Sequence, residues 1–89
     1  MTAAPRILLV DDEIAIQRAV GPLLQTQGYE VEMASAGQAA LKLAAEHAPD
    51  LIVLDLGLPD LDGTEVCRRI RETSAVPIIV LSARGGEAM

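Results

Sequence analysis

Acidic residues follow two of the apolar runs in this sequence, at the point where each run ends. Asp11 and Asp12 come directly after residues 7–10, and Asp55 comes directly after residues 51–54. Carboxylates that share a small space repel one another, and a hard cation such as Mg²⁺ offsets that repulsion while keeping sites for water and phosphate oxygens. With such a cation bound, one carboxylate can attack a phosphoryl group. The pattern therefore indicates magnesium-dependent phosphoryl chemistry, provided that the two run ends meet.

The apolar runs are expected to be the strands that bring these residues together. Residues 7–10, 51–54 and 78–81 are unbroken and rich in branched side chains, which is typical of parallel strands buried on both faces. Residues 30–34 alternate between polar and apolar side chains, as a half-exposed edge strand does. Four strands are therefore predicted.

Helical periodicity occupies the segments between the strands. In the first segment Ile16, Val20, Leu23 and Leu24 share one face, with Gln17, Arg18 and Gln25 on the solvent side and Gly28 after the end. Gly21-Pro22 interrupts this pattern and predicts a kink or a helix in two parts. Residues 35–38 have the form of a capping box before a second helix at 39–47. Residues 62–65 open a third helix at 66–72, with Val66 and Ile70 on one face.

This alternation predicts an α/β fold with a parallel sheet, right-handed crossovers and helices on both faces. Ligands of such sheets bind beyond the carboxyl ends of the strands, where Asp11, Asp12 and Asp55 stand. Ser82 ends the fourth strand and can donate a hydroxyl hydrogen bond to a phosphoryl group. The loop after Asp55 contains Gly57, whose backbone carbonyl has access to a metal ion.

Composition excludes several other classes of protein. The chain has 89 residues, a formal charge of −6, one Cys and no Trp or Phe, so one acidic domain with an aliphatic core is expected. The negative charge disfavours nucleic-acid binding, and a lone Cys fits a reducing, cytoplasmic setting. No apolar run approaches the roughly 20 residues that a membrane span needs, and the N-terminus does not resemble a signal peptide.

Three motifs together resemble a response regulator receiver domain of two-component signalling. They are residues 7–13 (ILLVDDE), 50–63 (DLIVLDLGLPDLDG) and 76–84 (VPIIVLSAR), and the likeness runs from Arg6 to Arg84. The second and third motifs are similar to the branch with a winged-helix DNA-binding output domain, and within it to the regulators of potassium-transport operons. The resemblance implies a flavodoxin-like three-layer fold with strand order 2-1-3-4 in the part present.

The resemblance also implies roles for single residues. Asp55 would accept a phosphoryl group from the phosphohistidine of a sensor histidine kinase, and Ser82 would be the switch hydroxyl. Asp12 would bind Mg²⁺ directly, Asp11 mainly through water, and Gly57 through its carbonyl. The chain would then not be an enzyme but a phosphoacceptor that regulates an attached transcriptional output domain.

The family pattern continues beyond Arg84 with elements that this chain does not contain. The family continues with a fourth helix, a fifth strand ending in a Lys and a fifth helix, so residues 1–89 are expected to be a C-terminally truncated receiver whose phosphotransfer is open to question. Its last strand, residues 78–81, would be an exposed apolar edge that pairs with another chain, giving a homo-oligomer. Two alternatives remain: an interaction fragment without phosphotransfer, and a haloacid-dehalogenase-like Mg²⁺ phosphohydrolase. The latter needs a second Asp at position 57, which is Gly.

Overall fold

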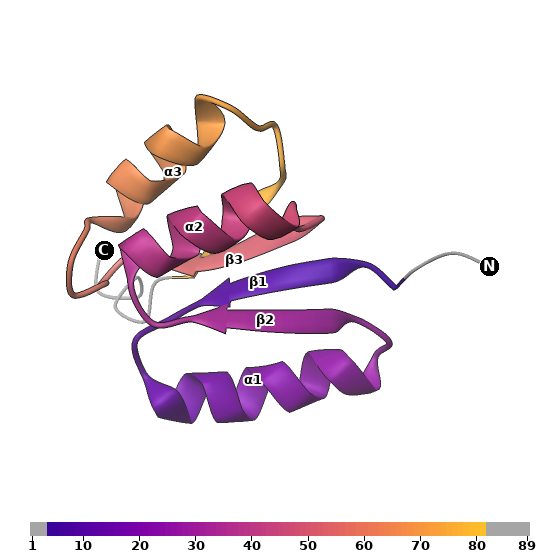
Figure 1. Ribbon diagram of the computed structural model, residues 1–89. Coiled ribbons are helices and arrows are strands. Elements are labelled where there is room, and N and C mark those ends of the chain that lie inside the picture. The colour runs from indigo at the N-terminus through magenta and orange to yellow at the C-terminus, as the bar shows by residue number, and fades with distance from the viewer. Residues whose placement is uncertain (1–3, 82–89) are drawn as a thin grey trace.

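The computed structural model describes residues 4–81, which form a parallel four-stranded sheet with helices on both faces (Figure 1). The strands are β1 (Arg6–Val10), β2 (Glu30–Ala34), β3 (Leu51–Asp55) and β4 (Ile78–Leu81), in the order β2-β1-β3-β4. The helices are α1 (Ile14–Thr26) on one face, and α2 (Gly37–His47) and α3 (Gly63–Arg71) on the other. The predicted fold class, strand order and half-exposed edge position of residues 30–34 are confirmed.

The core lies between the sheet and the pair α2–α3. Leu8 and Val10 of β1 and Ile52 and Leu54 of β3 point to this side and are fully buried. The residues of α3 that meet them are Val66 and Ile70, which share one helical face as predicted. β1 lies between β2 and β3, and its residues from Ile7 to Val10 are all buried, so both of its faces are covered and no polar side chain interrupts its apolar run.

Helix α1 is continuous through Pro22, so the expected division into two parts is wrong. Pro22 lies on the exposed side, where its ring meets solvent rather than the sheet. The preceding Gly21 is buried, and a Cβ there would collide with the end of the Met33 side chain on β2. α1 thus lies close to β2 at the residue before the proline. As expected, the chain leaves the helix at Gly28, whose φ of 97° suits glycine.

The N-terminus of α2 is capped in a way that the sequence pattern did not indicate. The capping box expected at residues 35–38 is wrong, because Ala36 is the N-cap residue and makes no side-chain cap bond. The Asp60 carboxylate, from the loop after β3, accepts hydrogen bonds from Gly37 N (2.6 Å) and Gln38 N (2.9 Å). These bonds, that from Gln38 foremost, hold the pKa of Asp60 below its usual range. Asp60 thus ties the β3–α3 loop to α2.

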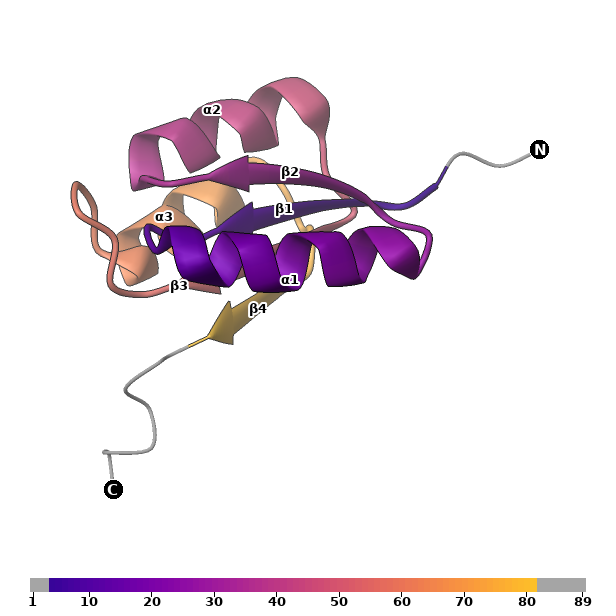
Figure 2. The same cartoon turned by 90° about the horizontal axis from the view of Figure 1, so that it is seen from below.

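Strand β4 forms one edge of the sheet and is poorly covered (Figure 2). Ile79, Val80 and Leu81 are 50%, 45% and 40% exposed, whereas the neighbouring strand β3 is better buried. In the part of the chain described, no helix is long and apolar enough to cross a membrane.

Candidate metal and phosphoryl site

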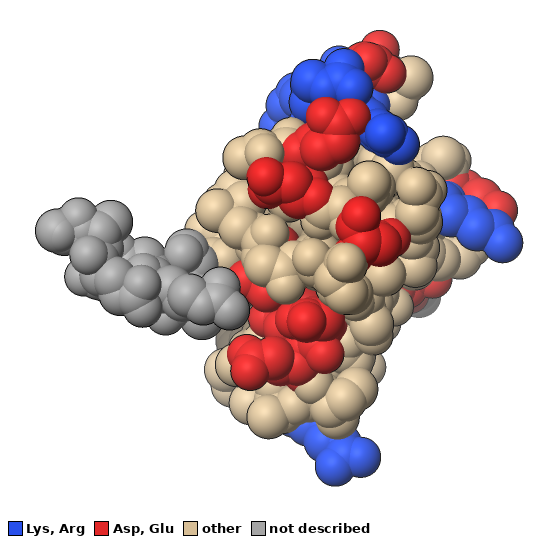
Figure 3. Space-filling model, turned by 90° about the vertical axis from the view of Figure 1, so that its left-hand side faces the viewer, with Lys and Arg blue, Asp and Glu red and all other residues tan. Residues whose placement is uncertain are grey.

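Three carboxylates converge at the carboxyl end of the sheet. Asp11 and Asp12 follow β1, Asp55 is the last residue of β3, and the pairing of Val10 with Leu54 brings the two strand ends side by side. One carboxylate oxygen from each Asp lies within 4.8 Å of the others. Acidic side chains gather on the face of the molecule that contains these strand ends (Figure 3). The convergence expected from the sequence is therefore present.

Asp11 is the buried member of the cluster, with 5% of its surface exposed. Its backbone N–H donates to the Ala34 carbonyl (3.0 Å), and its Oδ1 accepts from the Glu13 N–H (2.8 Å). Burial raises the pKa of the Asp11 carboxyl; the Glu13 hydrogen bond opposes this, and the charges of Asp55 and Asp12 add to it. Asp12 is exposed and Asp55 is half-buried. The cluster thus offers one anchored and two more accessible carboxylates.

This donor set fits Mg²⁺. The ligand atoms are all hard oxygens, and three carboxylates with oxygens within 4.8 Å of one another repel at a cost that a divalent cation relieves. Among the described residues, Asp11, Asp12 and Asp55 are the one group of three or more acidic, His or Cys side chains placed to share a metal ion. With two of the three accessible, room remains for water and phosphate oxygens.

Of the other two expected site residues, Gly57 lies within the described part of the chain and Ser82 does not. Gly57 is exposed in the loop between β3 and α3, beside the cluster in sequence. The Gly63 N–H donates to the Leu56 carbonyl (3.2 Å), closing this loop at its base, and Asp60 anchors its middle to α2. Ser82, the expected switch hydroxyl, lies outside the described residues.

Sequence reasoning missed one residue next to the cluster. Gln17 was expected on the solvent side of α1, and that expectation is wrong, because Gln17 is only 8% exposed. Its side-chain amide donates to the Asp11 carbonyl (2.7 Å) and to Ser35 Oγ (3.1 Å). The buried residues of α1 are Gln17 and Gly21. Because neither is a large apolar residue, the spacing of apolar residues could not indicate this face of the helix.

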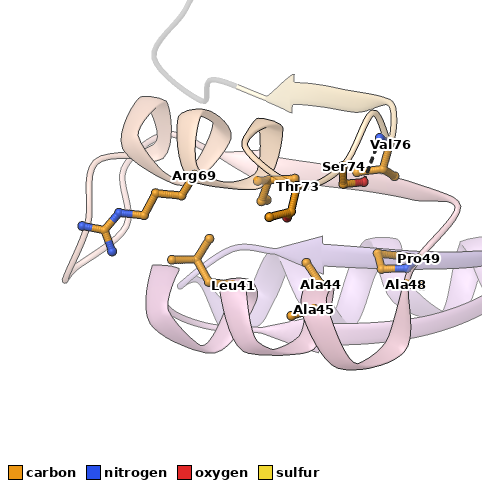
Figure 4. Close-up of a pocket in the computed structure, with 10 residues that line it drawn as sticks. Leu41, Ala44, Ala45, Ala48, Pro49, Arg69, Thr73, Ser74 and Val76 are labelled. Carbon is orange, nitrogen blue, oxygen red and sulfur yellow. Dashed lines mark hydrogen bonds between the residues drawn. The ribbon is translucent and has the colours of Figure 1, made fainter.

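A groove lies between α2 and α3, apart from the acidic cluster (Figure 4). It has a volume of about 490 Å³, and its walls include Leu41, Ala44 and Ile70, with Arg69 at one end and Ser74 and Val76 at the other. The Arg69 Nε donates to Glu65 (2.8 Å). None of the three clustered Asp residues lines this groove.

Comparison with known families identifies the class of protein that this fold and site define. The family model for the response regulator receiver domain matches residues 7–89. The chain therefore belongs to the receiver domain family of two-component response regulators, as its three motifs indicated.

Several of the similar curated proteins are transcriptional regulators. The chain is 51% identical over 82 residues to the KDP operon transcriptional regulatory protein KdpE of Escherichia coli, covering 92% of this chain and 36% of that protein. It is also 51% identical over 83 residues to the transcriptional regulatory protein AfsQ1 of Streptomyces coelicolor, covering 93% of this chain and 37% of that protein. The expected likeness to the potassium-transport operon regulators is confirmed. The chain spans about a third of the length of these relatives.

Solved structures of receiver proteins share the fold. The chemotaxis response regulator CheY4 of Vibrio cholerae superimposes with a TM-score of 0.84 at 36% identity, covering 86% of this chain and 67% of that one. A CheY-like receiver domain protein from Methanospirillum hungatei gives a TM-score of 0.87 at 31% identity, covering 89% and 64%.

Proposed function

We propose that this chain accepts a phosphoryl group on Asp55 from the phosphohistidine of a sensor histidine kinase, and that it regulates a transcriptional output domain in the whole protein. The convergence of Asp11, Asp12 and Asp55 within 4.8 Å at the carboxyl end of the sheet carries the proposal. Membership of the receiver family and the transcriptional regulators among its relatives support it. A cytoplasmic location goes with this role.

Asp55 is the member of the cluster suited to be the nucleophile. It ends the inner strand β3 and is half-buried, so its position is set by the sheet while the side chain stays partly exposed. A carboxylate oxygen of Asp55 attacks phosphorus, the phosphorus–nitrogen bond of the phosphohistidine breaks, and the imidazole leaves with the electron pair. The product is an aspartyl phosphate. The chain thus takes up one phosphoryl group and turns over no substrate.

The remaining residues hold the metal ion and the phosphoryl group. Bound Mg²⁺ supplies neutralisation of the charge on the transferring oxygens. In this proposal Asp12 binds the ion directly, Asp11 binds mainly through water, and Gly57 contributes its backbone carbonyl. The burial of Asp11 and its bond from Glu13 keep that carboxylate fixed. Ser82 is proposed as the hydroxyl that moves to the phosphoryl group.

Phosphorylation of one aspartate tests the proposal. The chain is incubated with Mg²⁺ and acetyl phosphate, and its intact mass is measured. One phosphoryl adduct is expected, lost in Asp55→Asn and kept in Asp50→Asn. Asp50 is a matched control because it precedes the same strand at its opposite end, where its side chain accepts from the Arg6 N–H (2.8 Å).

Two other results would contradict the proposal. Hydrolysis of phosphate esters without an adduct would point to a phosphohydrolase of the haloacid-dehalogenase type. If neither an adduct nor hydrolysis is observed, the chain is instead an interaction fragment without phosphotransfer.

We also propose that the chain self-associates through β4. The exposed apolar side chains Ile79, Val80 and Leu81 stand on a strand at the edge of the sheet, and residues 75–81 carry no charge that would discourage pairing. A second copy pairing its own β4 in antiparallel orientation gives a closed, two-fold dimer. Light scattering at tens of micromolar is expected to show the dimer, and Ile79→Lys to give a monomer. A clean monomer of the unaltered chain would refute this.

A further inference from the structure

Gln17 is a buried polar side chain directed from α1 toward the carboxyl ends of β1 and β2. Its amide nitrogen donates to the backbone carbonyl of Asp11 (2.7 Å) and to the hydroxyl oxygen of Ser35 (3.1 Å). A carbonyl oxygen can only accept, so the bond to Asp11 sets which way the amide group faces. With 8% of its surface exposed, Gln17 makes these bonds largely away from water, where an unpaired polar group is costly.

The bond from Gln17 holds the peptide group on which the acidic cluster depends. The Asp11 N–H is held by the Ala34 carbonyl (3.0 Å), and its carbonyl is held by Gln17. The chain at Asp11 is therefore fixed on both sides by groups from different elements, β2 and α1. The orientation of this peptide decides where the side chains of Asp11 and Asp12 point.

We propose that Gln17 is a positioning residue for the metal site: it fixes the backbone at Asp11 so that the carboxylates of Asp11 and Asp12 face Asp55. The inference rests on the proposed function, because it concerns the same site, although Gln17 has no part in holding the ion. Groups outside the ligands that orient them typically change metal affinity by about ten- to hundredfold when removed. Packing alone does not account for a glutamine here, since an apolar side chain fills the same space without the cost of burying an amide.

Gln17→Met tests the inference, because methionine keeps the length of the side chain and removes both donors. Ile70→Val is the control: it trims a buried side chain of α3 on the other face of the sheet. Urea unfolding curves in EDTA first establish conditions in which every variant is folded. Mg²⁺ affinity is then measured by NMR titration, together with amide hydrogen exchange in the metal-free chain. If Gln17→Met does not fold, Gln17→Asn replaces it, since an amide one methylene shorter falls short of the Asp11 carbonyl.

The expected result is Mg²⁺ binding about ten- to hundredfold weaker in the Gln17 variant and unchanged in Ile70→Val. In the metal-free chain, exchange is expected to quicken at the Asp11 and Glu13 amides, both of which are hydrogen-bonded here, more than at the amides of α3. Unchanged Mg²⁺ affinity in the Gln17 variant would overturn the inference. If the unaltered chain binds no Mg²⁺, the proposed metal site fails, and amide hydrogen exchange in the Gln17 variant tests the positioning role. Faster exchange confined to the amides around Asp11 supports that role, and equally faster exchange throughout the chain refutes it.

Discussion

The acidic cluster predicts that neutralising Asp55 stabilises the metal-free protein. Asp55→Asn keeps the shape of the side chain and removes one of three charges whose oxygens lie within 4.8 Å of one another. Two unit charges at that distance repel by about 1 to 3.5 kcal/mol for effective dielectric constants between those of water and a protein surface. Because Asp12 is exposed and Asp55 is half-buried, the screened end of the range applies. We expect the free energy of unfolding in EDTA to rise by about 1–2 kcal/mol.

The assay is urea unfolding followed by far-ultraviolet circular dichroism at neutral pH and low salt. Glu46→Gln is the matched control, because it removes the same charge from an exposed position on α2, away from the cluster. Mg²⁺ is expected to reverse the order of stability: at about 100 times its dissociation constant, a ligand stabilises the folded state by about 2.7 kcal/mol. The unaltered chain receives this stabilisation, and Asp55→Asn receives little of it. An Asp55→Asn variant no more stable in EDTA than Glu46→Gln would refute the reasoning.

Three further predictions concern the loop and helix that follow the site. Gly63→Ala is expected to lower the free energy of unfolding by about 1–3 kcal/mol, because the added Cβ would lie 2.7 Å from the Leu56 Cα. Urea unfolding measures this change. A change below about 0.5 kcal/mol, which is typical of surface substitutions, would contradict the close packing. Asp60→Ala is expected to lower the melting temperature and to speed amide exchange in the first turn of α2, and unaltered exchange there would show that the cap contributes nothing. Hydrogen bonds from two arginines lower the pKa of Glu65 from 4.5 to about 2, so its stabilising effect is complete above pH 4.5 and is lost as the pH falls toward 2. Glu65→Gln is expected to make the free energy of unfolding depend less on pH in that window. The same pH dependence in the variant and the unaltered chain would refute this.

The strands and the cluster were predictable because both follow from short-range patterns. Unbroken branched runs such as residues 51–54 have few options besides a buried parallel strand, and the topology of such sheets places Asp11 and Asp55 at the same edge. The family resemblance then supplied the expected roles. None of this required knowledge of which residues touch.

What failed were inferences that depended on contacts between distant segments. The capping box looked complete at residues 35–38, but Asp60, 23 residues after Gly37, provides the cap. Gln17 is polar, so periodicity assigned it to solvent, although a backbone carbonyl at the end of β1 needs a donor there. Of the kink or division expected at Pro22, the division does not occur: the helix is continuous there, and the preceding Gly21 packs against Met33 of β2. Each error is a case in which a partner remote in sequence decides the outcome.

The central position of β1 has a consequence for the order in which the molecule folds. β1 is the first strand in the chain, yet one of its two partners, β3, begins at Leu51, 45 residues after the start of β1 at Arg6. Until β3 is present, the edge of β1 that pairs with β3 has no backbone partner, and Leu8 and Val10 lack the neighbouring Ile52 and Leu54 of the core, so the first half of the chain cannot complete a folded unit. Closing so long a segment slows folding and prolongs the exposure of that edge. During synthesis the first strand must therefore wait for the third before the core between the sheet and the pair α2–α3 can form.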